Sequence, residues 1–268
     1  MDTASLKIVL TPALVGAASM AGRRWGPAVG GWLVGLPFTS GPVTLFLALD
    51  HGAQFAATVA AGTLAGTLSQ AVFCLAYAWT ARGRTWPLPL AAGLFGFAAS
   101  TFVLERLSLG FALICSIVLA GLVIALLAMP VARDVAPVAP PALPAWDIPA
   151  RMIVATVFVV FLTGLAARLG PALTGLLAPF PLYAAILTVF GHHLAGSEAA
   201  VKVLRGLLLG LFAFAGFFLV LALTLRRLGM AAAFGAAITI GLAIQATSLW
   251  ILRRGDLQRG VPRACGDG

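Results

Sequence analysis

Runs of about 20 apolar residues recur along the whole chain, and short stretches that carry charged residues separate them. An α-helix needs an apolar run of this length to cross the hydrocarbon core of a membrane. The short alternating segments of a transmembrane β-barrel are missing from the pattern. The sequence therefore predicts an all-α polytopic membrane protein with about nine helices, at about residues 5–21, 28–49, 53–80, 87–104, 108–130, 151–167, 172–191, 199–225 and 230–252.

One stretch of the second predicted helix occurs twice. Residues 24–37 read RWGPAVGGWLVGLP, and 144 positions later residues 168–181 read RLGPALTGLLAPFP. Aligning 24–80 with 168–224 gives 20 identities in 57 pairs, and many of the shared positions are Gly or Pro, which fix backbone geometry. We infer an internal duplication. With five spans between equivalent points, equivalent helices run in opposite directions, so we expect an inverted repeat.

The duplication divides the chain into a first membrane repeat (1–130), a Pro-rich linker (131–149), a second repeat (150–252) and a basic cytoplasmic tail (253–268). Residues 5–21 look like a signal peptide, but their counterpart at 150–166 favours a membrane helix. With nine spans and the N-terminus outside, 12 of the 17 Lys and Arg residues fall on the cytoplasmic side. This asymmetry predicts an outside N-terminus and a cytoplasmic C-terminus.

Composition supports a membrane location. Hydrophobic residues make up 61% of the chain, charged residues 9%, and the mean hydropathy is +1.06. The net charge of +9 comes from basic residues in the gaps between apolar runs, which is typical of loops that meet anionic lipid headgroups. We therefore expect membrane lipid as a partner and no nucleic acid. Cys74, Cys115 and Cys265 lie far apart and show no metal-ligand or disulfide spacing.

Prolines interrupt the second and seventh predicted helices at matching places in the two repeats. A proline inside a membrane helix frees backbone groups, which are tolerated where protein or a water-filled cavity surrounds them. The ends of half-helices can then bind a solute near the middle of the membrane. The alternative is a pair of kinks that serve helix packing alone. On the first view, the substrate-binding candidates are Pro37, Thr39, Ser40, Gly41, Pro42, Thr44, Pro179, Pro181, Tyr183 and Thr188.

Titratable residues near helix ends are the next candidates. His192 or His193 could couple transport to protons, and Lys202 or Arg205 could hold an anion. The alternative is that these side chains anchor the helix ends at the membrane surface.

The third predicted helix carries more polar side chains than the eighth, its counterpart in the second repeat. The third predicted helix carries Thr63, Thr67, Ser69 and Gln70 where the eighth carries apolar residues. They either form a polar wall or bond back to their own helix carbonyls, and the sequence leaves both open.

Two Gly-x-x-x-Gly pairs, Gly62–Gly66 and Gly206–Gly210, predict close helix packing. They are also candidate faces for a homodimer.

Motifs of enzymes are missing: there is no zinc-binding His pair around Glu, no nucleophile elbow, no pair of membrane aspartates and no phosphate-binding loop. We expect no enzyme activity, no catalytic residue, no metal and no cofactor.

The segment from Gly41 to Ala48, GPVTLFLA, is similar to a glycine-proline stretch of LrgB-type membrane proteins. The doubled plan, with a break followed by a glycine-spaced helix, resembles AbrB-type proteins. Both are bacterial two-repeat families linked to the export of small molecules. The resemblance implies a location in the bacterial inner membrane, and it covers about 30 residues of each half. No functional residue beyond the break is carried over.

These observations together predict a secondary transporter or exporter of a small solute, with a small anion as a candidate, which works by alternating access around the broken helices two and seven. Two other hypotheses remain open. A lipid flippase would have a groove that opens sideways to the bilayer. A partner subunit without transport activity would use its glycine faces to dock another protein.

Overall fold

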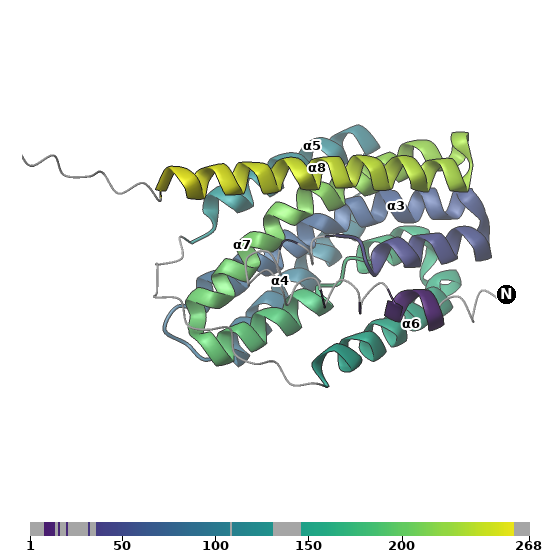
Figure 1. Ribbon diagram of the computed structural model, residues 1–268. Coiled ribbons are helices and arrows are strands. Elements are labelled where there is room, and N and C mark those ends of the chain that lie inside the picture. Colours follow the sequence, from purple (N-terminus) through teal and green to yellow (C-terminus); the bar gives the residue numbers. More distant parts are fainter. Residues whose placement is uncertain are drawn as a thin grey trace, which may run out of the picture.

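The computed structural model describes residues 8–13, 16, 20, 32, 36–107, 109–130 and 146–259. Its elements are α3 (Ser40–Thr80), α4 (Pro87–Arg106), α5 (Phe111–Ala128), α6 (Asp147–Leu177), α7 (Leu182–Leu228) and α8 (Met230–Arg259) (Figure 1). The described residues contain no strand, which confirms the predicted all-α class. By length and composition, all six helices could cross a membrane, as expected for a multi-pass membrane protein.

Parts of several predictions fall outside the described residues. These are most of the first predicted helix, most of residues 28–35, most of the linker and residues 260–268 of the predicted tail. Where the tail is described it differs from the expectation, because α8 continues as a helix to Arg259.

A single glycine interrupts each of the long helices α3, α6 and α7. Gly52 has φ 84° and ψ 169°, Gly196 has φ 82° and ψ 177°, and Gly170 has φ 77° and ψ 165°. Side chains other than hydrogen make this conformation costly. Gly52 and Gly196 lie 144 positions apart, at aligned positions of the predicted repeats, and both adopt the same backbone conformation. They divide α3 into segments 40–51 and 53–80, and α7 into segments 182–195 and 197–228.

The two long segments, 53–80 and 197–228, run antiparallel (Figure 1). Near one end, Arg226 donates a hydrogen bond from Nη2 to Thr58 Oγ1 at 3.3 Å. Near the other end, residues 83–86 that follow α3 line a pocket together with Gly196 and Ser197. The beginning of each segment therefore lies beside the end of the other.

Glycines let α6 pack closely on α3. A Cβ atom added at Gly62 would lie 2.7 Å from the Ala172 carbonyl oxygen and 3.1 Å from the Gly175 Cα atom. One added at Gly66 would lie 2.7 Å from Pro179 Cγ. Such close contacts require that positions 62 and 66 of α3 carry no side chain. The first predicted glycine face is therefore used within the chain, and Gly206 and Gly210 are also buried. A homodimer through these faces stays a prediction.

α4 and α5 cover other faces of α3. Gly93 of α4 lies against Phe73, and Trp79 Nε1 donates to the Ala128 carbonyl oxygen of α5 at 3.0 Å. Large apolar side chains such as Phe95 on α4 and Leu127 on α5 are exposed. Outward-facing apolar side chains of this kind fit a helix surface that contacts lipid.

Candidate functional site

The chain leaves the helical conformation at both predicted proline breaks. The first break is residues 36–39, which precede α3, and the second is residues 178–181, between α6 and α7. At the second break, where an interrupted helix was predicted, the chain forms two separate helices, α6 and α7. Pro42 lies in the first turn of α3, where a missing N–H group costs no helical hydrogen bond.

The two breaks share one backbone hydrogen-bond pattern. In the first break, Phe38 N donates to Leu36 O at 2.8 Å, and Gly41 N donates to Pro37 O at 2.9 Å. In the second, Leu182 N donates to Phe180 O at 2.7 Å, and Ala185 N donates to Pro181 O at 2.7 Å. Each bond in one break has its counterpart 144 positions away. The aligned prolines therefore build the same turn twice.

The fold brings the two breaks into contact. Ser40 Oγ, at the start of α3, donates to the Ala178 carbonyl oxygen in the second break at 2.8 Å. Ser40, Pro179 and Pro181 are buried, and the Phe180 ring packs between Phe97 and Phe158. The breaks therefore form a closed junction inside the bundle in this conformation.

The other hydroxyl candidates differ in how they are satisfied. Thr44 Oγ1 donates to the Ser40 carbonyl oxygen of its own helix at 2.9 Å. Thr39 is half-buried at the N-cap position of α3 and makes no side-chain cap hydrogen bond. Thr188, the counterpart of Thr44, is fully buried, yet its Oγ1 has no hydrogen-bond partner. Tyr183 is half-buried beside the second break in sequence.

His192 is the most strongly positioned of the titratable candidates. Its Nδ1 lies 3.1 Å from Tyr77 Oη on α3, and its Nε2 lies 3.0 Å from the Arg84 carbonyl oxygen. Because a carbonyl only accepts, Nε2 carries the proton and Nδ1 accepts from the Tyr77 hydroxyl. Sequence reasoning missed Tyr77 and Arg84 as partners. The available signal was Tyr77 itself, since a tyrosine buried in an apolar helix usually needs a hydrogen-bond partner.

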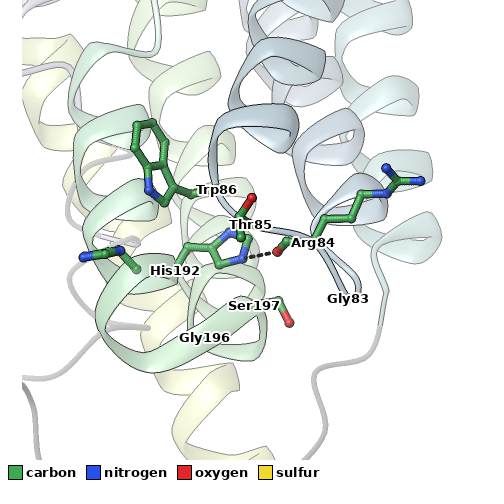
Figure 2. Close-up of a pocket in the computed structure, with 8 residues that line it drawn as sticks. Gly83, Arg84, Thr85, Trp86, His192, Gly196 and Ser197 are labelled. Atoms are coloured by element: carbon green, nitrogen blue, oxygen red, sulfur yellow. Dashed lines mark hydrogen bonds between the residues drawn. The ribbon is translucent and has the colours of Figure 1, made fainter.

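An open pocket of about 400 Å³ lies at this end of the bundle (Figure 2). The loop after α3 and the turn around Gly196 form its walls, with His192 at the boundary between pocket and protein interior. Figure 2 shows the His192 ring directed at the main chain of Arg84, whose guanidinium extends away from it. The residues that line the pocket are Gly83, Arg84, Thr85, Trp86, His192, His193, Gly196 and Ser197.

The remaining titratable candidates lie at or near the surface of the chain. His193 and Arg205 are exposed, and Lys202 is half-buried. Among the described buried residues there is no Lys, Arg, Asp or Glu. The structure therefore brings His193 to the pocket with His192 and places no ionised side chain inside the junction of the two breaks.

The four polar residues of α3 that were candidates for a polar wall fall into three groups by their hydrogen bonds. Thr63 and Thr67 bond back to the carbonyls of Val59 and Thr63, at 2.9 and 3.1 Å, so they serve their own helix. Ser69 accepts from Thr101 Oγ1 on α4 at 2.9 Å. Gln70 differs, because it is 6% exposed and its Oε1 has no hydrogen-bond partner.

Neither metal ligands nor known relatives narrow the function further. No group of three or more His, Cys, Asp or Glu side chains that could hold a metal occurs in the described part of the chain. Comparison of the chain with protein-family models, with curated proteins and with solved structures gives no match. The predicted resemblance to AbrB- and LrgB-type proteins therefore stays a prediction, and function is argued from the site alone.

Proposed function

We propose that this chain is a secondary transporter of a small solute, and that the junction of the two breaks is the centre of its alternating-access movement. The observation that carries the proposal is the hydrogen bond from Ser40 Oγ to the Ala178 carbonyl oxygen. It joins the start of α3 to the end of α6, so half-helix ends from both repeats meet at one place. Such junctions bind substrate and ions in transporters built from repeats.

The antiparallel course of segments 53–80 and 197–228 supports an inverted repeat. These segments are equivalent in the duplicated sequence, and the contacts at Thr58 and Ser197 place opposite ends together. If each glycine turn ends one span and begins the next, each break divides one membrane span into two half-helices. Together with the predicted first helix, the count is then nine spans, as expected from the hydropathy pattern.

The same contacts support the predicted sidedness. The pocket joins residues 83–86 with residues 192–197, and both are predicted on the cytoplasmic side. Arg226 and Thr58 contact each other, and both are predicted on the outer side. We therefore propose an outside N-terminus and a cytoplasmic pocket in a bacterial inner membrane.

An anionic solute was expected from Lys202 and Arg205, but the burial pattern gives it less support. Lys202 is only half-buried and Arg205 is exposed, so neither side chain supplies a positive charge to the buried junction. These residues remain candidates for contacts with lipid headgroups or with a solute at the surface.

Cysteine accessibility tests the proposal directly. Single cysteines at Thr39, Ser40, Ala178 and Pro179 would be placed in a variant without Cys74, Cys115 and Cys265, and membrane-impermeant thiol reagents applied from each side. Because Ser40, Ala178 and Pro179 are buried, labelling there requires an opening movement. We expect labelling in both breaks, with a preferred side that shifts when conditions favour the other conformation.

A cysteine at Ala125 of α5 is the matched control, because Ala125 is 3% exposed and lies outside both breaks. If the cysteines in the breaks stay as unreactive as the control from both sides, the breaks serve packing alone and the transporter proposal fails.

A further inference from the structure

Two buried polar atoms without a hydrogen-bond partner lie on the helices that connect the pocket with the second break. They are Gln70 Oε1 on α3 and Thr188 Oγ1 on α7. Leaving such a group unsatisfied costs free energy, and in native structures each exception calls for an explanation. Both side chains are more than nine-tenths buried, so bulk water at the surface does not satisfy them.

Contacts at two levels show that segment 53–80 of α3 and the first segment of α7, residues 182–195, run side by side in the same direction. Near the second break, Gly66 lies against the Pro179 ring, and near the pocket Tyr77 bonds to His192. At 1.5 Å per residue, the path from Gly66 to Tyr77 is about 16 Å, and that from Pro181 to His192 is also about 16 Å. The two helices therefore stay in step between these contacts.

Helical periodicity places Gln70 on the face of α3 that carries Gly66 and Tyr77. It places Thr188 on the face of α7 that carries His192. Gln70 is four residues after Gly66 and seven before Tyr77, while Thr188 is four residues before His192 and seven after Pro181. Residues at these spacings share one face of a helix. Along the helix axis, Gln70 is thus about 6 Å from Gly66, on the way to the pocket, and Thr188 is about 6 Å from His192, on the way to the second break. The two residues lie on opposite sides of one helix interface.

The equivalent interface of the other repeat is apolar at three of the four aligned positions. In the 144-residue alignment, Gln70 corresponds to Phe214, Tyr77 to Leu221 and His192 to Ala48, and all three apolar residues are buried. Thr188 corresponds to Thr44, which is also buried, but the Thr44 hydroxyl donates to the Ser40 carbonyl oxygen of its own helix. Of these aligned positions, only Gln70 and Thr188, on the interface that ends at the pocket, carry a buried polar atom without a hydrogen-bond partner.

We propose that Gln70 and Thr188 bind the polar group of an uncharged, hydrogen-bonding solute on its way between the pocket at His192 and the second break. The inference rests on the proposed transport function. A glutamine amide and a threonine hydroxyl each offer both a donor and an acceptor. No ionised side chain is buried among the described residues, so an ion here would lose its hydration without a compensating charge.

Three thiol reagents of different charge test this proposal, with each rate divided by the rate of the same reagent with a free thiol in water. In the variant without native cysteines, Gln70→Cys and Thr188→Cys would each be treated with methyl methanethiosulfonate, which is neutral, and with its anionic sulfonatoethyl and cationic trimethylammonioethyl analogues. Comparing the reagents at one cysteine cancels that cysteine's own reactivity. We expect the neutral reagent to react at both sites, and the charged reagents to react at least about tenfold more slowly because they must be desolvated.

Two matched controls show whether reaction is specific to the proposed path or occurs at any buried cysteine of the bundle. Ala71→Cys is the neighbour of Gln70, is 3% exposed in the wild-type chain and lies off the face of α3 that carries Gly66 and Tyr77. Thr163→Cys replaces another buried threonine, whose hydroxyl bonds back to Val159 at 2.8 Å. Because Thr188→Cys removes only one methyl group and exchanges oxygen for sulfur, it is a smaller change than Gln70→Cys and is expected to fold even if Gln70→Cys does not.

The outcomes distinguish this inference from the function on which it rests. If cysteines in the breaks are labelled but Gln70→Cys and Thr188→Cys react no faster than the controls, the path is wrong and the transporter proposal stands. Equal rates for neutral and charged reagents at these two sites would overturn the uncharged class of solute. Silence at the breaks would remove the transporter proposal itself.

Discussion

Ser40 donates its hydroxyl hydrogen to the main-chain carbonyl oxygen of Ala178, which lies 138 positions further along the chain. Both residues are buried; Ser40 directly follows the first proline break, and Ala178 belongs to the second. The bond links the beginning of one helix to the end of another, where backbone groups lack helical partners. It therefore contributes to closing the junction in the conformation described.

Removing the Ser40 hydroxyl is expected to weaken this junction. Ser40→Ala leaves a buried carbonyl oxygen without this donor, and we expect a loss of about 1–3 kcal/mol in the free energy of unfolding. Unfolding of the purified protein in detergent would measure it. Thr44→Val is the control, because Thr44 bonds only to its own helix. If both variants lose the same amount, the bond between the breaks has no special role.

Close packing between α3 and α6 predicts intolerance at Gly62. Gly62→Ala would bring a methyl group onto backbone atoms, which cannot move aside as a flexible side chain can. Overpacking of this kind typically costs about 1–3 kcal/mol. Gly164→Ala on α6 is the control, since a Cβ there meets nothing within 4 Å and alanine favours the helix. A Gly62→Ala protein as stable as wild type would contradict the described helix contact.

Backbone conformation alone predicts the outcome at the two glycine turns. An added Cβ at Gly52 or Gly196 meets nothing within 4 Å, yet both residues have a positive φ. Gly52→Ala and Gly196→Ala should each cost about 1–3 kcal/mol through strain, measured by unfolding in detergent. Gly110→Ala has equal space and φ −64°, so it should cost much less. Equal tolerance at all three positions would argue against the sharp turns.

The Tyr77–His192 hydrogen bond predicts a measurable coupling between α3 and α7. A double-mutant cycle with Tyr77→Phe and His192→Ala should give an interaction energy of about 1 kcal/mol in unfolding experiments. Pairing Tyr77→Phe with Thr163→Val should give additive losses, because Thr163 bonds to its own helix elsewhere. Additive losses for Tyr77 and His192 as well would show that the contact does not form.

The proposed orientation of the protein in the membrane can be tested directly. Impermeant thiol labelling of Thr85→Cys and His193→Cys should come from the same side of the membrane, because both residues are exposed and line one pocket. By the charge asymmetry this side is the cytoplasm. Leu228→Cys, at the exposed end of α7, should label from the opposite side. Labelling of Thr85→Cys and His193→Cys from opposite sides would exclude the described arrangement.

Much of the backbone plan was predictable because glycine and proline act locally. Residues 53–80 were predicted as one helix, and the structure begins that segment after Gly52. The breaks at Pro37 and Pro181 were also predictable, since proline acts on its own turn of helix. The first turn of α3 was less so, because Pro42 was expected to interrupt a helix that it in fact begins.

Side-chain partners were harder to predict because they depend on which helices become neighbours. Nothing local to Tyr77 indicates a residue 115 positions away, and the Arg84 carbonyl carries no sequence signal at all. For the same reason, the sequence could not separate Thr63 and Thr67, which bond back to α3, from Gln70, which does not.

The glycine face of α3 also constrains how the protein is made. Gly62 is covered by Gly175 of the second repeat, so it has no partner until 113 further residues have been synthesised. At roughly 5–20 residues per second, this takes on the order of ten seconds. During that time the glycine face of α3 is exposed to the surrounding lipid or to the insertion machinery. A ribosome stalled before residue 171 would therefore hold an incomplete bundle, because the residues that cover Gly62 would not yet be made.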